Sequence, residues 1–477
     1  MGVTRRALLA SAMGFGGIAA TMGGLHWNWS RKEFTRSGYD NLPQAAQPGE
    51  FNWMNWSGNQ RATPSSIAFP QSEEELAEII ASSSKSIRPV GSGHSFSALV
   101  PSEGTIVDVS GIEGMTSYDP STGFARFGAG TRLFHAASEL DKIGRALPNL
   151  PDIDVQTLAG TFATATHGTG DSLTALHDYI EGFRLVIGSG EVLDITRETD
   201  PDLFAAGKVS LGALGVMTEF TLRTVPAFKL HRKLTVEPIR DFYDKIEALG
   251  AEHRNFEFFY FPGTGQVASL THQIYDGPVD AESSTETDDD EFLAGLKELR
   301  DTFGWFPWLR RQIAISSFPS GLIEDRRDDS FALLSTVRPV KFNEMEYHLP
   351  RENGVATVRK IVKMLDARGE VFFPMEYRHV ASDNAWLSPF NHGASASIAI
   401  HAAVDERFDF FFSEFEPVFQ AAGGRPHWGK LNSLSHSQAQ QIYPYFTAFD
   451  EIRQSVDPDG KFLNPYLADL FGANRNA

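Results

Sequence analysis

Cysteine is absent from the 477-residue sequence, which excludes disulfide scaffolds, thiolate zinc sites and cysteine nucleophiles. Positively charged residues are also outnumbered, since 42 Lys and Arg against 61 Asp and Glu give a net charge of −19. This field repels phosphate backbones, so nucleic acid is not expected as a partner. The HExxH motif, the GxxxxGK[ST] loop and the complete GxGxxG fingerprint are all missing, so neither a metal site nor a Rossmann nucleotide site is expected.

Length and composition are typical of a folded protein with more than one packed unit. A single hydrophobic core stops growing near roughly 250–300 residues, and this chain has 477. Hydrophobic residues make up 42% and charged residues 22% of the chain, which is the ordinary globular range. The 37 Phe suit both large cores and flat apolar cavities.

The N-terminus has the pattern of an export signal. Arg5 and Arg6 precede an uncharged run, rich in Ala and Gly, from Ala7 to Leu25. This pattern resembles a twin-arginine signal, so we expect residues 1–30 to direct export to the periplasm or the extracellular space. The alternative is a permanent N-terminal membrane anchor, for which the run is long enough but only weakly apolar.

The chain from 55 to 227 alternates between short strands and helices. Ser72 and Glu75 have the spacing of a capping box, which predicts a helix that begins just after Ser72. A second helix is expected to stop at Gly144, where glycine allows the left-handed backbone of a helix end. Alternating apolar residues on both sides of a glycine turn at 188–190 predict a hairpin.

The chain from 228 to 424 has a different pattern, in which aromatic-rich strands such as 256–261 alternate with helical stretches. An acidic stretch at 280–291 interrupts this pattern and is expected to be a solvated surface loop. The change of pattern near residue 228 predicts two domains, each with helices and strands.

Several Gly-x-Gly turns follow expected strands, and the first of them is Gly91-Ser92-Gly93. Because glycine has no Cβ, backbone amides in such a turn can approach a phosphate closely. Taken alone, these turns are weak evidence for a nucleotide site.

Three segments in order, 88–96 (RPVGSGHSF), 152–170 (DIDVQTLAGT through ATHGTG) and 211–219 (LGALGVMTE), resemble the FAD-binding segments of the vanillyl-alcohol oxidase flavoprotein family. Residues 338–347, 373–378 and 425–430 resemble the aldonolactone oxidase branch of that family. The resemblance covers about Trp53 to Leu470. It implies a two-domain α+β fold, with a PCMH-type FAD-binding domain at 55–227, an α/β cap domain for the substrate at 228–424, and a C-terminal segment at 425–477 that returns to the flavin.

The resemblance also implies roles for particular residues in cofactor binding. His94 follows the glycine turn and is expected to be bonded covalently to the 8α-methyl group of FAD. His167 is expected to be structural or a neighbour of the pyrophosphate. The full set implied to contact FAD is Gly91, Ser92, Gly93, His94, Ser95, Asp152, Gly160, Thr161, His167, Gly168, Gly170 and Val216.

Four residues are candidates for catalysis. Glu376 and Arg378 are two apart, so in a strand they project to the same face, and the guanidinium is expected to keep the carboxylate ionised. The resemblance places this pair over the flavin, although a structural ion pair is the alternative. Lys430 is expected at the flavin edge, and His401 is either a core histidine or part of the substrate pocket.

The sequence therefore predicts an FAD-dependent oxidoreductase that oxidises a hydroxyl group of a sugar-1,4-lactone or polyol, with hydride transfer to flavin N5. Electrons would pass to oxygen or to another acceptor. One alternative keeps the fold and changes the substrate to a larger apolar alcohol, as the 37 Phe and the aromatic patch at 305–308 suggest. Another is an exported flavin- or sugar-binding protein without turnover.

Overall fold

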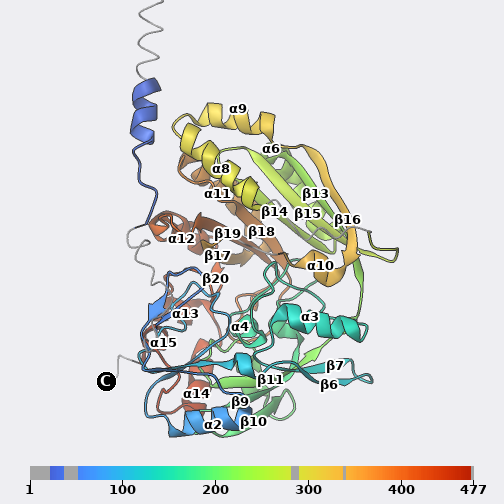
Figure 1. Ribbon diagram of the computed structural model, residues 1–477, viewed down its shortest axis with the longest axis vertical. Coiled ribbons are helices and arrows are strands. Elements are labelled where there is room, and N and C mark those ends of the chain that lie inside the picture. Colours follow the sequence, from blue (N-terminus) through green and yellow to red (C-terminus); the bar gives the residue numbers. More distant parts are fainter. Residues whose placement is uncertain (1–21, 37–51, 281–288, 337–339, 474–477) are drawn as a thin grey trace, which may run out of the picture.

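The structure is a computed structural model that describes residues 22–36, 52–280, 289–336 and 340–473. Figure 1 shows two lobes: a lower one built on several small sheets, here called the base lobe, and an upper one built on a single large sheet, here called the cap lobe. Both lobes contain helices and strands, which confirms the predicted α+β class. The twin arginines lie outside the described residues.

The base lobe contains most of the strands in the first half of the chain. Its parallel sheet has the order β3-β5-β4, and its antiparallel sheet has the order β10-β9-β11-β7-β6. The strands are β3 (Ser66–Ala68), β4 (Ile87–Val90), β5 (Thr105–Asp108), β6 (Met115–Asp119), β7 (Phe124–Gly128), β9 (Ile180–Val186), β10 (Val192–Thr196) and β11 (Val216–Arg223). Two small pairs join β1 (Trp53–Met54) to β2 (Arg61–Ala62) and β8 (Arg145–Ala146) to β12 (Val225–Pro226). The helices are α2 (Glu73–Ser82), α3 (Leu133–Lys142), α4 (Leu158–Ala163) and α5 (Pro201–Gly207).

Local sequence signals account for several of these boundaries. The Ser72 side chain accepts a hydrogen bond from the amide of Glu75 at 3.2 Å, which confirms the predicted start of α2. Glu75 in turn accepts from the amide of Gln71, one residue earlier than in the standard box. Gly144 adopts φ +71° directly beyond α3, as predicted. The predicted hairpin is the antiparallel pair of β9 and β10.

The cap lobe is built on an eight-stranded sheet in which every neighbouring pair is antiparallel, in the order β16-β13-β15-β14-β18-β19-β17-β20. Its strands are β13 (Lys229–Pro238), β14 (Asn255–Phe261), β15 (Gln266–Tyr275), β16 (Gly321–Asp329), β17 (Phe342–Pro350), β18 (Met375–Val380), β19 (Ser395–Ala403) and β20 (Arg425–Pro426). Its helices are α6 (Ile239–Phe242), α7 (Ile246–Glu252), α8 (Asp289–Phe303), α9 (Pro307–Ser317), α10 (Ser330–Leu334), α11 (Gly354–Ala367) and α12 (Glu416–Ala421).

The two faces of this sheet have different surroundings because side chains alternate along each strand. On β14, Phe256, Phe258 and Tyr260 are fully buried in one hydrophobic core with Val358 and Ile361 of α11. The alternate β14 residues therefore point to the other face, which lies toward the base lobe (Figure 1).

The prediction of a surface loop at 280–291 is wrong for the last residues of this stretch, because α8 begins at Asp289. Leu296 of this helix is 2% exposed, Leu293 packs at the edge of the cap core, and the ring of Phe292 contacts that of Phe261. These apolar contacts stabilise a helix that the acidic composition of the stretch did not predict. Residues 281–288 of the stretch lie outside the described residues.

The C-terminal residues return to the base lobe as α13 (His436–Ile442), α14 (Phe446–Val456) and α15 (Pro465–Phe471). Phe446, Phe449 and Phe471 belong to the base core. The amide of Asn464 donates to the carbonyl oxygens of Ala98 and Pro101 at 2.8 and 2.9 Å. The end of the chain is thereby fixed beside the segment that follows the first glycine turn.

Arg88 connects three distant segments of the base lobe. Its guanidinium is fully buried and donates to four carbonyl oxygens, those of Leu99, Leu211, Gly212 and Phe462, at 2.5–2.8 Å. Burial lowers the pKa of Arg88 to about 9, so the side chain remains charged at neutral pH. The residue that precedes the glycine turn thus joins β4 to the 211–212 turn and to the C-terminal segment.

Residues 22–36, here called the N-terminal strap, are a helix at 22–29 followed by an extended segment on the cap lobe. Trp29 is 8% exposed, and its indole nitrogen donates to the carbonyl of Arg300 at 3.1 Å. A Cβ on Gly304 would lie 2.1 Å from the Trp29 ring, so glycine is needed where the strap docks. Within the described ranges, none of the helices is long and apolar enough to cross a membrane.

We predict that Gly304→Ala releases the N-terminal strap. The added methyl group would overpack the Trp29 contact, which typically costs about 1–3 kcal/mol and would raise the undocked population by roughly 5- to 150-fold. Trypsin should then cleave faster at Arg31 and Lys32, as followed by mass spectrometry of the fragments. The matched control is Gly295→Ala, because its Cβ would have no atom within 4 Å. Equal cleavage rates in the two variants would show that Trp29 does not hold the strap.

Candidate active site

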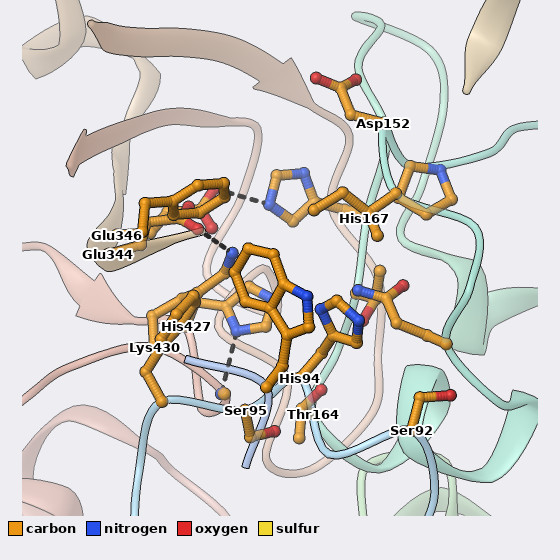
Figure 2. A pocket seen from close by; sticks show the side chains of 18 of the residues that line it. Ser92, His94, Ser95, Asp152, Thr164, His167, Glu344, Glu346, His427 and Lys430 are labelled. Atoms are coloured by element: carbon orange, nitrogen blue, oxygen red, sulfur yellow. Dashed lines mark hydrogen bonds and ion pairs between the residues drawn. The ribbon is translucent and has the colours of Figure 1, made fainter. Parts of the chain in front are cut away.

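A cavity of about 710 Å³ lies between the two lobes. Figure 2 shows side chains from both lobes converging in it, with Glu344 and Glu346 on one side and Ser92 and His94 on the other. The cavity also passes between the glycine turn after β4 and the apolar residues Val109, Leu211 and Val216 of the base lobe. The cavity therefore contacts both the glycine turn of the base lobe and the charged face of the cap.

The glycine turn is shaped by its contact with the start of α4. A Cβ on Gly91 would lie 2.0 Å from the Thr157 hydroxyl, and Gly93 adopts φ +67°. The hydroxyl of Ser92 donates to the carbonyl of Val155 at 2.5 Å. Glycine is thus required at both positions, and the backbone between them faces the cavity.

The residues around this turn fit a flavin dinucleotide. Gln156 lines the cavity, and its side-chain oxygen is buried without a hydrogen-bond partner among the described residues. A buried polar atom without a partner is costly, so it is suited to receive a donor from a bound molecule. The turn at 91–93 and the backbone near Gly160 would hold the pyrophosphate, and the indole of Trp56 and the imidazole of His94 form a flat wall for a ring.

His94 stacks on Trp56, with ring centroids 4.8 Å apart and planes inclined by 24°. Burial, followed by the nearby charges of Lys430, Arg132 and Lys341, lowers the pKa of His94 to about 4. Its imidazole is therefore neutral at physiological pH and has a nitrogen lone pair available for bonding.

Arg378 lies at the centre of the cap side of the cavity among three carboxylates. Its guanidinium is 2.6 Å from Asp152 of the base lobe, 3.1 Å from Glu257 of β14, and in contact with Glu376 of β18. Register explains part of this arrangement, because Glu257 lies opposite Arg378 in the sheet. Burial lowers the pKa of Arg378, but the charges of the three carboxylates outweigh it and hold the pKa well above its ordinary value.

Glu376 is less acidic than the sequence suggests. Burial raises its pKa to about 7, against the opposing effect of Arg378 and with the help of Asp152. The expectation that Arg378 keeps Glu376 ionised is therefore wrong near neutral pH, where the carboxyl group is divided between its two protonation states. A carboxyl group with a pKa near the working pH is suited to proton transfer.

A second charged group combines Lys430, Glu344 and His401. The ammonium of Lys430 contacts Glu344 of β17, whose other oxygen is 3.6 Å from His401 of β19. Burial alone would raise the pKa of Glu344, but Lys430 and His401 outweigh it and lower the pKa to about 2. The His401 ring also contacts the carbonyl of Pro374 at 2.7 Å. His401 thus lines the cavity and is also held by the cap.

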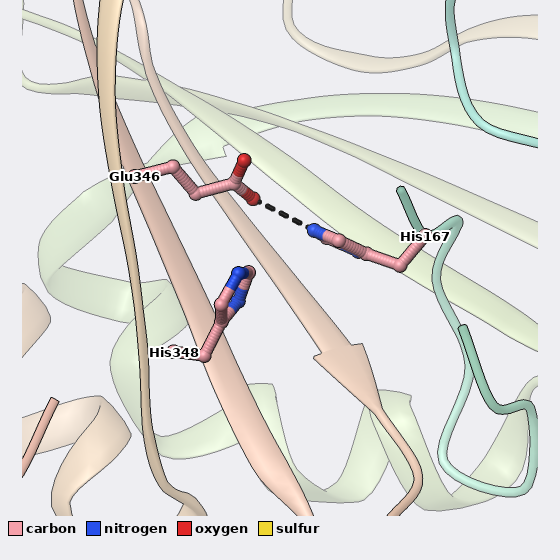
Figure 3. Close-up of side chains that lie close together, drawn as sticks. All are labelled: His167, Glu346 and His348. Carbon is pink, nitrogen blue, oxygen red and sulfur yellow. Dashed lines mark hydrogen bonds and ion pairs between the residues drawn. The ribbon is translucent and has the colours of Figure 1, made fainter. Parts of the chain in front are cut away.

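A third group surrounds Glu346, two residues along β17. His167 lies 2.9 Å from this carboxylate, and the hydroxyl of Ser397 donates to the same oxygen at 2.5 Å. Figure 3 shows His348 beside this pair, with its ring centroid 5.0 Å from that of His167. Burial opposes ionisation of Glu346, but His167 outweighs it and holds the pKa well below the ordinary value. The pair joins the HGTG segment of the base lobe to the cap sheet.

The structure brings most of the predicted site residues to one cavity. Those that line it are Gly91, Ser92, Gly93, His94, Ser95, Asp152, Gly160, His167, Val216, Glu376, Arg378, His401 and Lys430. Thr161, Gly168 and Gly170 lie behind its wall: Thr161 is inside α4, a Cβ on Gly168 would lie 2.3 Å from the Leu150 carbonyl, and the Gly170 amide donates to His379 of the cap.

The sequence reasoning missed Glu257, Glu344 and Glu346, each of which lines the cavity. A signal for two of them was present, because Glu344 and Glu346 alternate with Asn343 and Met345 in a strand that also contains Phe342, Tyr347 and Leu349. Carboxylates two apart in such a strand share a face, as Glu376 and Arg378 do. The sequence held no comparable signal for Glu257, a single charge in an aromatic strand.

Comparison with known proteins supports the nucleotide site and the cap. A family model described as D-arabinono-1,4-lactone oxidase matches residues 220–470, and one described as FAD binding domain matches residues 64–196. The L-gulono-1,4-lactone dehydrogenase of Mycobacterium tuberculosis is 33% identical over 88% of this chain and 99% of its own. The alditol oxidase of a Streptomyces species is 28% identical over 87% of this chain and 98% of its own.

Among solved structures, cholesterol oxidase from B. sterolicum superposes with a TM-score of 0.71 at 15% identity, over 90% of this chain and 99% of its own. This likeness is one of fold. Fold and site together define a flavin-dependent oxidoreductase whose cofactor is FAD. The chain belongs to the D-arabinono-1,4-lactone oxidase family, since the family model and the relative from M. tuberculosis both cover more than half of it.

We predict that Glu376→Gln slows anaerobic flavin reduction by about 10²–10³-fold, the usual effect of removing one interaction made in the transition state. The wild-type rate should rise with pH through about 7, because the carboxyl group accepts a proton only above its pKa. The variant should lose this rise. Stopped-flow absorbance over pH 5–9 measures both effects.

The matched control for this substitution is Glu352→Gln, an exposed position outside the cavity, which should keep the parental rate and pH profile. Melting temperature and flavin content separate a loss of chemistry from a loss of folding. A parental rate and profile in Glu376→Gln would show that the carboxyl group takes no part in proton transfer.

Proposed function

We propose that the protein oxidises a hydroxyl group of a sugar-1,4-lactone or polyol. The observation that carries the proposal is the group around Arg378, in which a carboxyl group with a pKa near 7 lies beside a fixed cation in the FAD-bearing cavity. Vicinal hydroxyl groups suit a carboxylate and a planar guanidinium held side by side. The printed names of the relatives, which include a gulonolactone dehydrogenase and an alditol oxidase, support the same substrate class.

FAD, when bound, supplies the acceptor for the hydride that leaves the carbinol carbon. The ionised Glu376 would take the hydroxyl proton, so the substrate loses a hydride and a proton and becomes a carbonyl compound. Arg378 would hold the oxygen during this step. Lys430, fixed by Glu344, would place a positive charge beside the ring that receives the hydride. Oxygen or another acceptor would complete the cycle.

A flavin- or sugar-binding protein without turnover would have no use for this chemistry. A carboxyl group that is buried beside a guanidinium shared with two more carboxylates lowers the stability of the fold, because these charged groups lose their contact with water. Proton transfer gives such an arrangement a purpose, whereas simple binding is served by neutral donors and acceptors. This cost favours an enzyme over a binding protein.

The experiment that tests the proposal mixes the oxidised protein with a panel of alditols, aldonolactones and apolar alcohols without oxygen. Bleaching of the flavin absorbance near 450 nm identifies the compounds that donate a hydride. Bleaching by alditols or lactones is the expected result. A protein that binds these compounds and is bleached by none of the panel would contradict the proposal.

We also propose that FAD is linked covalently through His94. Its neutral imidazole and its stacking on Trp56 support a bond from a ring nitrogen to the 8α-carbon of the flavin. The bond replaces one hydrogen of the methyl group and leaves the flavin reduced by two electrons, which the acceptor that serves turnover would remove.

His94→Ala should therefore give a folded protein that releases all its flavin on acid precipitation. The wild type should keep a fluorescent band on a denaturing gel. His135→Ala, an exposed position on α3, is the control and should retain that band. Flavin that stays with the acid-precipitated His94→Ala protein would identify another residue as the link.

We further propose that the protein is exported by its twin-arginine segment. Docking of Trp29 on the cap lobe favours a mature chain that keeps Trp29 and the rest of the strap after it, with any cleavage before Trp29. Replacing Arg5 and Arg6 by Lys should leave folded, flavin-loaded protein in the cytoplasm, as measured by cell fractionation and flavin fluorescence. Unchanged export of that variant would refute the assignment, and intact mass of the exported wild type locates the cleavage point.

A further inference from the structure

The cap-sheet face that lines the cavity changes from charged to apolar along a row of paired residues. Glu257 lies opposite Arg378, Leu270 lies opposite Glu257, and Leu234 lies opposite Leu270. Directly opposite residues of antiparallel strands share a face, and all four side chains line the cavity. The charged residues of this row lie on β18 and β14, and its residues on β15 and β13 are apolar. Beyond Leu234 the row reaches Glu324 of β16, which pairs with Arg232 at 2.6 Å, and both also line the cavity.

A second row, two residues along, repeats the change. Glu376 lies opposite Phe259, Phe259 opposite Ala268, and Ala268 opposite Val236. These four side chains also line the cavity. The two rows together form a continuous apolar surface, here called the apolar groove, which consists of Leu234, Val236, Phe259, Ala268 and Leu270.

Aromatic rings line the outer end of the groove. Phe261, Phe292 and Phe318 are in mutual contact, with ring centroids 5.0–5.4 Å apart, and all three line the cavity. Phe292 is 37% exposed and Ile323, another lining residue, is 42% exposed. The groove therefore leads from Glu376 to the surface between α8 and β16.

The groove is long compared with a free sugar lactone or polyol. From β18 to β13 the sheet crosses three strand spacings, which at about 4.8 Å each is roughly 14 Å. A hydroxyl group placed against Leu270 or Val236 would lose its hydrogen bonds to water without replacement. Free sugars and polyols carry hydroxyl groups at nearly every carbon, so they suit the charged part of the face and not the groove.

We propose that the natural substrate is an amphiphilic alcohol. Its hydroxylated end binds at Glu376 and Arg378, and an aliphatic or aryl substituent at the other end lies along the apolar groove. This inference rests on the proposed function, because it assigns the oxidised hydroxyl to the same site. It adds that the polyol or lactone is part of a larger molecule whose apolar part gives the affinity.

The test uses the alditol or lactone that bleaches the flavin most rapidly, together with its alkyl ethers of increasing length at the end remote from the oxidised carbon, all below their micellar concentrations. Each buried methylene group is worth about fourfold in affinity. We expect kcat/KM to rise by about this factor per methylene, through a lower KM, until the chain fills the groove. Calorimetry with the dithionite-reduced protein, which cannot turn over, should show the same trend in Kd.

Leu270→Asn should flatten this dependence on chain length, because it places an amide in the middle of the groove. Ala268→Phe provides a second, apolar variant and should stop the rise at a shorter chain. Leu322→Asn is the matched control, since Leu322 is 55% exposed and does not line the cavity; it should keep the parental dependence.

The outcomes separate this inference from the proposed function. If alditols or lactones bleach the flavin but their alkyl ethers react no better, the amphiphilic substrate is wrong and the proposed function stands. A chain-length effect that persists in both groove variants would place the substituent elsewhere and would also overturn the inference. If only simple apolar alcohols bleach the flavin, the hydroxylated end is wrong, and both proposals fail.

Discussion

The buried guanidinium of Arg378 is the interaction on which the site depends. It holds Asp152 of the base lobe at 2.6 Å and Glu257 of the cap at 3.1 Å, and it contacts Glu376. Removing one member of such a cluster leaves an uncompensated buried charge, which is strongly destabilising. The same contacts that hold Glu376 in the cavity therefore also join the base lobe to the cap lobe. Substitutions of Asp152 are therefore expected to change both the site around Arg378 and the contact between the lobes.

The cap sheet shows how one layer can serve as core and site together. One face is sealed by α7 and α11 over Phe256, Phe258 and Tyr260, which leaves the alternate residues free to carry charge. Four carboxylates on the open face have these partners: Arg378 for Glu257 and Glu376, Lys430 for Glu344, and His167 for Glu346. All three partners lie in the sequence segments that also resemble the family. The lobes are thus joined by paired charges, and the space between the pairs is the cavity.

Much of the fold and part of the site could be predicted from local sequence. The serine cap before α2, the stop at Gly144 and the hairpin of β9 and β10 depend on contacts a few residues apart. The shared face of Glu376 and Arg378 follows from strand alternation alone. The start of α8 at Asp289 could not be predicted from this acidic stretch, because the apolar contacts that favour the helix come from distant parts of the cap.

The sequence by itself determined the element types, the glycine turn with His94 beside it, and the identity of a cation and a carboxyl group on one strand face. Only the tertiary structure decided what surrounds them. Glu257 reaches Arg378 through strand register across 121 positions of the chain, and no local spacing encodes such a pairing. Burial, which raises the pKa of Glu376 to about 7, is likewise a property of the closed cavity. The apolar groove depends on the same register, because it exists only when β13, β15 and β14 lie side by side and turn the same face toward the FAD-bearing lobe.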